Sequence, residues 1–205
     1  MHAAGKQQPV NCIDVSAGGN LGISGSNDGK VRIWDATSGA LKRDLVGHFG
    51  DIYVTKLLPS VQVAMTTGAD LQIKIWRIED ALNAATLIGH KAAITSLSFV
   101  ERGRNFVSCS KDGVMKLWDC ASQTCITDLH KQPLSLKSNN YLWNCHVAQD
   151  AILAPVAASQ QQLEKDFGTE SKLAICSSES VKLHAWTFAT EAQFSNINMK
   201  VMQTH

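Results

Sequence analysis

The sequence predicts an all-β protein built from stacked four-stranded sheets, and two kinds of regularity support this prediction. Tryptophans recur every 42 residues, at Trp34, Trp76 and Trp118, and aspartates, Gly-His pairs and Ser or Thr residues keep the same spacing. Within each 42-residue period, short apolar runs alternate with turn residues, which is typical of β-strands. A unit of this length cannot bury both faces of its sheet alone, so neighbouring units must stack.

Each repeat contains four candidate strands. In the first repeat an apolar run precedes the turn Asn27-Asp28-Gly29, and an alternating run follows it; residues 63–77 and 106–119 have the same arrangement. Another apolar stretch follows each Trp, and a further one follows each Gly-His pair. Four-stranded units stacked around an axis form a β-propeller. We therefore predict three regular blades at residues 5–46, 47–88 and 89–130.

The remaining residues, 131–205, keep the repeat less well. Residues 172–186 match the run–turn–run arrangement and end on Trp186, but Ser180 and Cys176 replace the turn Asp and the strand hydroxyl. We predict a degenerate fourth blade with a polar insertion at about 148–171, and the start of a further blade at residues 194–201. Because closed propellers have four to eight whole blades, we expect this chain to be part of a longer propeller.

The repeat resembles the WD-repeat family, whose units carry Gly-His near the start and Trp-Asp at the end. Two of the three repeated tryptophans precede Asp, while Trp76 precedes Arg77. The resemblance implies a buried chain of hydrogen bonds from the turn Asp through His and the strand hydroxyl to the Trp indole. By position these residues are Ser24, Asp28 and Trp34 in the first blade, His48, Thr66, Asp70 and Trp76 in the second, and His90, Ser108, Asp112 and Trp118 in the third. The first blade has Lys6 where the others have His.

Ser or Thr, His and Asp are also the residues of nucleophilic catalytic triads. A catalytic set is needed once, whereas this set recurs in successive blades, so we assign it a structural role. Outside the repeated set, the sequence has no zinc-type Cys/His spacing, no phosphate-binding loop and no unique His–carboxylate pairing. We therefore expect a non-enzymatic protein that uses no metal and no cofactor.

Composition narrows the class of partner. Hydrophobic residues make up 44% and charged residues 18% of the chain, and the net charge is +1. This balance gives no support to a nucleic acid or an anionic membrane as partner, and no apolar run reaches the roughly 18 residues of a membrane span. The N-terminus lacks a secretory signal pattern, and the six cysteines form no CxxC pair. We expect protein partners and a location in the cytoplasm and nucleus.

The family resemblance also implies a partner-binding face, the narrower one around the central channel. The positions that line it are those just before each turn Asp and those three and five residues after each Gly-His histidine. In this sequence they are Asn27, Asp51, Tyr53, Ala69, Ala93, Thr95 and Lys111. Tyr53 is the one aromatic residue among them, and aromatic side chains are frequent anchors of protein interfaces.

A narrower resemblance covers residues 12–120 and continues at residues 166–175, beyond the regular blades. These segments resemble the WD-repeat chaperones that assemble the 19S regulatory particle of the 26S proteasome. The resemblance implies binding to the C-terminal domain of a proteasomal ATPase subunit and restraint of its docking on the 20S core. The alternative is a general WD-repeat scaffold in signalling or ubiquitin pathways. A cullin-ligase receptor would carry Trp-Asp-x-Arg, but Thr37, Glu79 and Ala121 occupy the Arg position.

Overall fold

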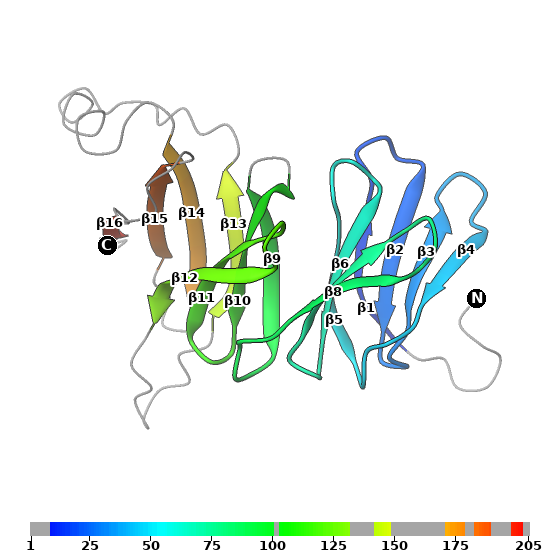
Figure 1. Ribbon diagram of the computed structural model, residues 1–205, viewed down its shortest axis with the longest axis horizontal. Helices are drawn as coiled ribbons and strands as arrows, with labels where there is room; N and C mark the ends of the chain where they lie inside the picture. The colour runs from blue at the N-terminus through cyan, green and yellow to red at the C-terminus, as the bar shows by residue number, and fades with distance from the viewer. Residues whose placement is uncertain are drawn as a thin grey trace.

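The computed structural model describes residues 9–100, 103–131, 142–148, 171–178, 183–189 and 198–202. These residues form four antiparallel sheets of four strands, and they contain no α-helix (Figure 1). The first two sheets comprise β1 (Val10–Val15), β2 (Leu21–Ser26), β3 (Val31–Asp35), β4 (Leu41–Leu45), and β5 (Ile52–Leu57), β6 (Val63–Gly68), β7 (Ile73–Arg77), β8 (Asn83–Leu87). The other two comprise β9 (Ile94–Val100), β10 (Asn105–Ser110), β11 (Val114–Asp119), β12 (Thr124–Lys131), and β13 (Leu142–Ala148), β14 (Ser171–Ser178), β15 (Leu183–Ala189), β16 (Asn198–Met202).

Each sheet is an up-and-down meander, so strands that follow one another in the chain pair with one another. The second and third strands meet at the turn that contains the repeated Asp. Gly29 and Gly113 follow this Asp in the first and third sheets and have left-handed backbones, with φ of 74° and 75°. In the second sheet Leu71 occupies the same position with φ of 63°. A side chain with a Cβ is strained in this region, so this turn is less favourable than its two counterparts.

The core lies between the sheets. Between the first and second sheets, Ile23, Ile33 and Leu45 pack against a face of the second sheet that includes Ile52 and Trp76, which is 1% exposed. The opposite face of the second sheet packs in the same way against the third sheet, whose matching tryptophan is Trp118. The second and third sheets therefore each present a tryptophan face to the preceding sheet, and the first and second each present an aliphatic face to the following one.

The fourth sheet corrects one prediction. The sequence suggested that residues 194–201 begin a further blade, but β16 pairs with β15 and is the fourth strand of the fourth sheet. Seven residues or fewer separate the Trp from the next strand in the first three repeats, whereas β16 starts twelve residues after Trp186. Because of this longer connection, the repeat spacing did not reveal that β16 belongs to the fourth sheet. Of the insertion predicted at about 148–171, the two end residues belong to β13 and β14, and residues 149–170 lie outside the described residues.

Candidate functional site

The second sheet contains a complete chain of polar side chains. His48 Nδ1 lies 2.8 Å from Asp70 Oδ2, and His48 Nε2 lies 2.7 Å from Thr66 Oγ1. The indole N–H of Trp76 donates to the same Thr66 hydroxyl at 2.7 Å. These residues come from the β4–β5 loop, the β6–β7 turn and strands β6 and β7. Their hydrogen bonds therefore join the second sheet to the loop that enters it.

The direction of these hydrogen bonds fits a neutral imidazole. Trp76 donates to Thr66, the Thr66 hydroxyl donates to Nε2 of His48, and Nδ1–H of His48 donates to the Asp70 carboxylate. Burial lowers the pKa of His48, although the hydrogen bond and the charge of Asp70 oppose this shift. The neutral form is therefore the one that the folded protein favours near pH 7.

The third sheet repeats the arrangement. His90 Nδ1 lies 3.0 Å from Asp112 Oδ2, His90 Nε2 lies 2.6 Å from Ser108 Oγ, and Trp118 donates to Ser108 at 2.8 Å. Burial acts to raise the pKa of Asp112, but hydrogen bonds from His90 and from the backbone N–H of Lys91 outweigh it, and the net shift is downward. Deprotonated Asp112 thus stabilises the loop that carries His90.

The first sheet contains a different network. Trp34 donates to Ser24 at 2.8 Å, as its counterparts do. Asp28, however, accepts from the guanidinium of Arg32, with Nη2 at 2.7 Å and Nη1 at 3.4 Å, and Arg32 Nε also lies 3.7 Å from Asp44. Buried Arg32 thus contacts the turn Asp through a two-point ion pair, which is a strong form of charged hydrogen bond.

These networks are poorly placed for catalysis. The hydroxyls of Thr66 and Ser108 belong to fully buried residues, and each accepts an indole N–H and faces an imidazole nitrogen. A substrate cannot reach a hydroxyl so enclosed. Within the described residues there is also no group of three or more His, Cys, Asp or Glu side chains that could hold a metal ion. No helix in the described part of the chain is long and apolar enough to cross a membrane.

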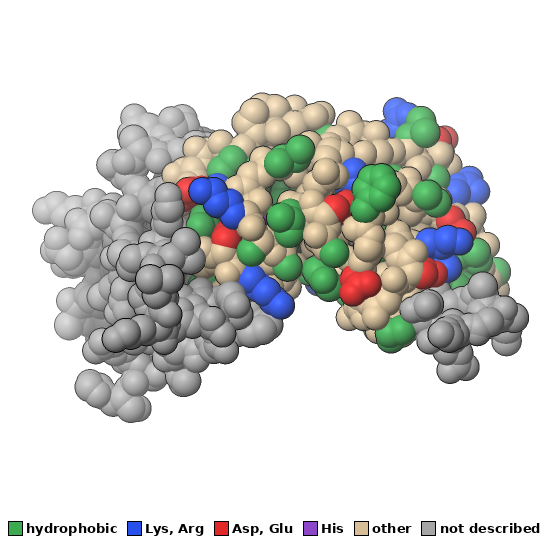
Figure 2. Space-filling model, turned by 90° about the horizontal axis from the view of Figure 1, so that it is seen from below, with side chains coloured by type: hydrophobic (Ala, Val, Ile, Leu, Met, Phe, Trp, Pro, Cys, Tyr) green, Lys and Arg blue, Asp and Glu red, His purple; other side chains and the backbone are tan. Residues whose placement is uncertain are grey.

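The predicted partner-binding positions lie at one end of the sheets, where the Asp turns and the loops between sheets meet. Figure 2 looks onto this end, which is at the bottom of Figure 1. The backbone N–H of Ala69 donates to Asp51 at 2.8 Å, and that of Lys111 donates to Ala93 at 2.9 Å, so turn and loop positions adjoin within each sheet. Ala69 and Lys111 are exposed, while Asp51 and Ala93 are partly exposed.

The equivalent positions on the first strands of the three regular sheets, Asn11, Tyr53 and Thr95, differ from one another. Asn27 is partly exposed and accepts a hydrogen bond from Asn11, the first-sheet counterpart of Tyr53. Thr95, the third-sheet counterpart, donates to the Leu142 carbonyl of the fourth sheet at 2.5 Å. Tyr53 itself is 38% exposed. The predicted face is therefore formed in part by residues that hold neighbouring sheets together.

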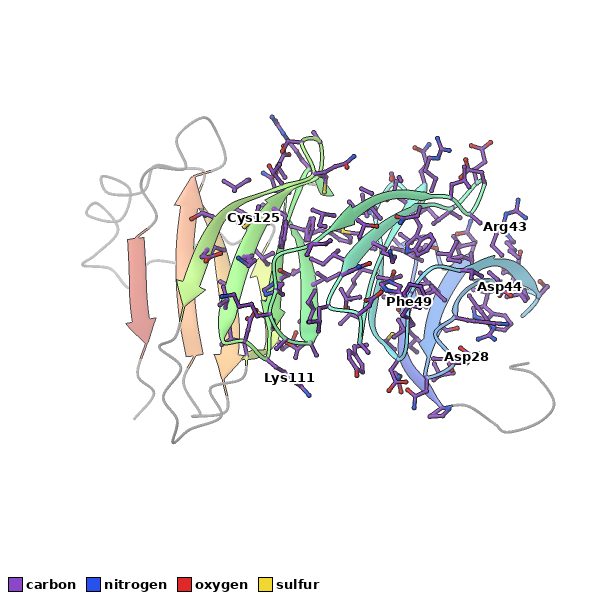
Figure 3. All side chains as sticks on the ribbon, turned by 60° about the horizontal axis from the view of Figure 1, so that its bottom comes forward. Asp28, Arg43, Asp44, Phe49, Lys111 and Cys125 are labelled. Carbon is purple, nitrogen blue, oxygen red and sulfur yellow. The ribbon has the colours of Figure 1, made fainter. Side chains whose placement is uncertain are left out.

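Sequence reasoning missed two residues at this end. Phe49, directly after the Gly-His pair, is 81% exposed, and Arg32 pairs with Asp28 in place of the absent histidine. Figure 3 labels Phe49, Asp28 and Lys111 at this end of the sheets. A basic residue four positions after the turn Asp recurs as Lys74 and Lys116, and this recurrence could have drawn attention to Arg32. No repeat rule singles out Phe49.

Comparison with known proteins places these features in a family. The model of the WD domain, G-beta repeat, matches residues 2–35 and 83–119. The 26S proteasome regulatory subunit RPN14 of Saccharomyces cerevisiae is 30% identical over 153 residues, or 75% of this chain and 36% of its own length. Nuclear distribution protein nudF 1 of Talaromyces marneffei is 32% identical over 127 residues, which cover 57% of this chain and 26% of that protein. Transducin beta-like protein 3 of Rattus norvegicus is 32% identical over 116 residues, which cover 56% of this chain and 14% of that protein.

The chain thus spans little more than a third, or less, of the length of these relatives. The matched family model, the 42-residue period and the four-stranded antiparallel sheets agree with one another. The hydrogen-bonded His, Asp, hydroxyl and Trp side chains of the second and third sheets lie at the repeated positions. The chain therefore contains WD40 repeats, and its described strands form four-stranded blades of the β-propeller kind.

Proposed function

We propose that this chain is a non-enzymatic platform for protein–protein interaction, and that it acts as a chaperone in assembly of the 19S regulatory particle. In this role it binds a proteasomal ATPase subunit and restrains the association of that subunit with the 20S core. It would act in the cytoplasm and nucleus. Its sequence resembles the proteasomal ATPase-associated factor, both in the regular blades and at residues 166–175.

One observation carries the narrower proposal. The match to the yeast proteasome regulatory subunit extends over 153 residues, which is longer than the three regular repeats together. The matches to the nuclear distribution protein and the transducin-like protein cover 127 and 116 residues, which is about the length of the three repeats. Repeat structure alone accounts for the shorter matches, whereas the longer one includes sequence outside the regular blades.

The proposal is tested by affinity capture with the tagged 205-residue chain in cell extract, followed by mass spectrometry. We expect recovery of an ATPase subunit of the 19S particle without subunits of the 20S core. The purified chain should also slow the formation of 26S particles from 19S and 20S particles in native gels. Absence of any proteasomal ATPase from the captured material contradicts the narrower function.

A general WD-repeat scaffold is the second candidate, and the breadth of the similarity favours it. The relatives with about 30% identity include proteins named for nuclear distribution and for likeness to transducin beta. Under this alternative, the chain captures proteins outside the proteasome, and substitutions at Tyr53 or Lys111 reduce their recovery. The same capture experiment thus separates the two candidates.

A further inference from the structure

Phe49 is an unusual residue for an exposed loop. It has the largest exposed fraction, 81%, of the large hydrophobic side chains in the described residues. Its backbone is nevertheless fixed, because its N–H lies 3.4 Å from Asp70 Oδ2, and the preceding His48 is bonded to the same carboxylate. After it, the Asp51 carbonyl accepts from Ala69. An aromatic ring on a loop already held in place can bind a partner with little loss of conformational entropy.

Tyr53 departs from the repeat at the same end of the second sheet. Its counterpart Asn11 donates to the Ile52 carbonyl of the next sheet at 3.0 Å, and Thr95 donates to Leu142 in the same way. In the described part of the chain, the Tyr53 side chain makes no such bond to the third sheet and is 38% exposed. The second blade thus replaces a bond between sheets by an exposed aromatic ring.

The third blade places positive charge at the matching positions. Lys91 is the counterpart of Phe49, and Lys111 is the counterpart of Ala69; both lysines are exposed. Their backbones are also fixed, since Lys91 N–H donates to Asp112 at 2.8 Å and Lys111 N–H donates to Ala93 at 2.9 Å. Packed sheets lie about 10 Å apart, so the lysines stand about that far from the aromatic pair.

We propose that Phe49, Tyr53, Lys91 and Lys111, here called the aromatic–basic surface, bind an extended segment of a partner protein with an apolar side chain and an acidic one. The apolar side chain packs on the two rings, and the carboxylate contacts the lysines. Because an extended chain advances about 3.3 Å per residue, three residues cover about 10 Å, which gives the pattern apolar-x-x-acidic. Partly exposed Asp51 repels an acid placed over the second blade, so the acid lies over the third.

This inference rests on the proposed interaction function and adds the chemistry of the segment that is bound. Both kinds of side chain are on the face seen in Figure 2, where hydrophobic groups and Lys or Arg groups lie over neighbouring sheets. In Figure 3, Phe49 and Lys111 are on adjacent blades at this end. Aromatic residues surrounded by polar ones are typical of the energetically important parts of protein interfaces.

The test is selection of a random-peptide display library on the full 205-residue chain. We expect enrichment of apolar-x-x-acidic peptides. A synthetic fluorescein-labelled peptide from the enriched set should bind the Phe49→Ser, Tyr53→Ser double variant at least about tenfold more weakly in fluorescence anisotropy. Selection on the Lys91→Glu, Lys111→Glu variant should yield Lys or Arg in place of the acid. A purely structural role of these residues would not reverse the selected charge.

Matched controls lie at the other end of the sheets. Leu82→Ser removes an exposed apolar side chain there, and Arg104→Glu reverses an exposed charge. Both should leave peptide affinity unchanged, and thermal melts should show that every variant is folded. No enrichment, or an enriched pattern unaffected by the two double substitutions, overturns the inference. Capture of a proteasomal ATPase in spite of that result would leave the proposed function standing, so the two failures are distinguishable.

Discussion

The first and second blades have the same strand order and register but stabilise the repeated Asp differently. In the second blade, Asp70 accepts from His48, which reaches across from the loop between the sheets. In the first blade, Asp28 pairs with Arg32, which lies on the strand that follows the same turn. The histidine links the turn to the preceding loop, whereas the arginine links it to β3 and, through Asp44, to β4. The fold thus tolerates a change of partner at this position.

The tryptophan faces of the same two blades differ in burial. On β5, Ile52, Thr55 and Leu57 are between 0% and 7% exposed, because the first sheet covers them. Their counterparts on β1 are between 46% and 71% exposed. These counterparts are Val10, Ile13 and Val15. Equivalent side chains therefore contribute to the stability of the described chain only where a neighbouring sheet packs against them.

The largest expected difference between the blades concerns the tryptophans. Trp76→Ala removes a ring that is 1% exposed and should lower the free energy of unfolding by about 3–5 kcal/mol. Trp34→Ala should cost less than half as much, because Trp34 is only partly buried. Urea denaturation followed by circular dichroism measures both. Equal losses would mean that burial against the neighbouring sheet does not set the contribution of this residue.

The strand hydroxyls give the next largest difference. Thr66→Val keeps the volume but leaves the Trp76 indole N–H and His48 Nε2 without a partner in the core, at a cost of about 2–3 kcal/mol. Ser24→Ala removes the acceptor of the Trp34 indole alone and should cost about 1 kcal/mol. The same denaturation experiment applies. A smaller loss for Thr66→Val than for Ser24→Ala contradicts the role assigned to the histidine-containing chain.

A stabilising substitution is expected at the turn of the second blade. Leu71 has φ of 63° where the first and third blades have glycine. Leu71→Gly relieves the strain of a left-handed side-chain-bearing residue but increases the freedom of the unfolded chain, so the net gain should be about 0.5–1 kcal/mol. Thermal denaturation should show a higher midpoint. Ala69→Gly, two residues earlier, is the control and should give no gain.

The smallest effect is the pH dependence that His48 contributes. The pKa of His48 is lowered in the folded protein. As the pH falls below about 6.5, the ordinary pKa of histidine, the unfolded chain therefore takes up the proton before the folded one does. The free energy of unfolding should therefore fall as the pH is lowered from 7 to 5, and only moderately, because Asp70 opposes the shift. The His48→Gln variant should show a shallower dependence in denaturation curves at pH 7, 6 and 5. An unchanged slope would exclude this histidine as the cause.

Much of the architecture follows from sequence periodicity. The 42-residue spacing of Trp, Asp and Gly-His locates the strands of the first three sheets, because each of these residues occupies a fixed position relative to a turn. The repeated positions also identified the residues that form the polar chains of the second and third blades. Prediction failed for β16, since a longer connection after β15 removed the spacing on which the argument depended.

The sequence by itself determined the fold class, the repeat length and the polar chains of the second and third blades, because local alternation and fixed spacing are properties of the chain alone. Only the tertiary structure decided how Asp28 is paired and which of several equivalent side chains are exposed. Pairing depends on which long side chain can reach a turn, and exposure depends on whether a neighbouring sheet covers a residue. Phe49 illustrates this limit, since its ring is exposed and its backbone N–H lies within hydrogen-bonding distance of Asp70, and neither property is encoded in a spacing.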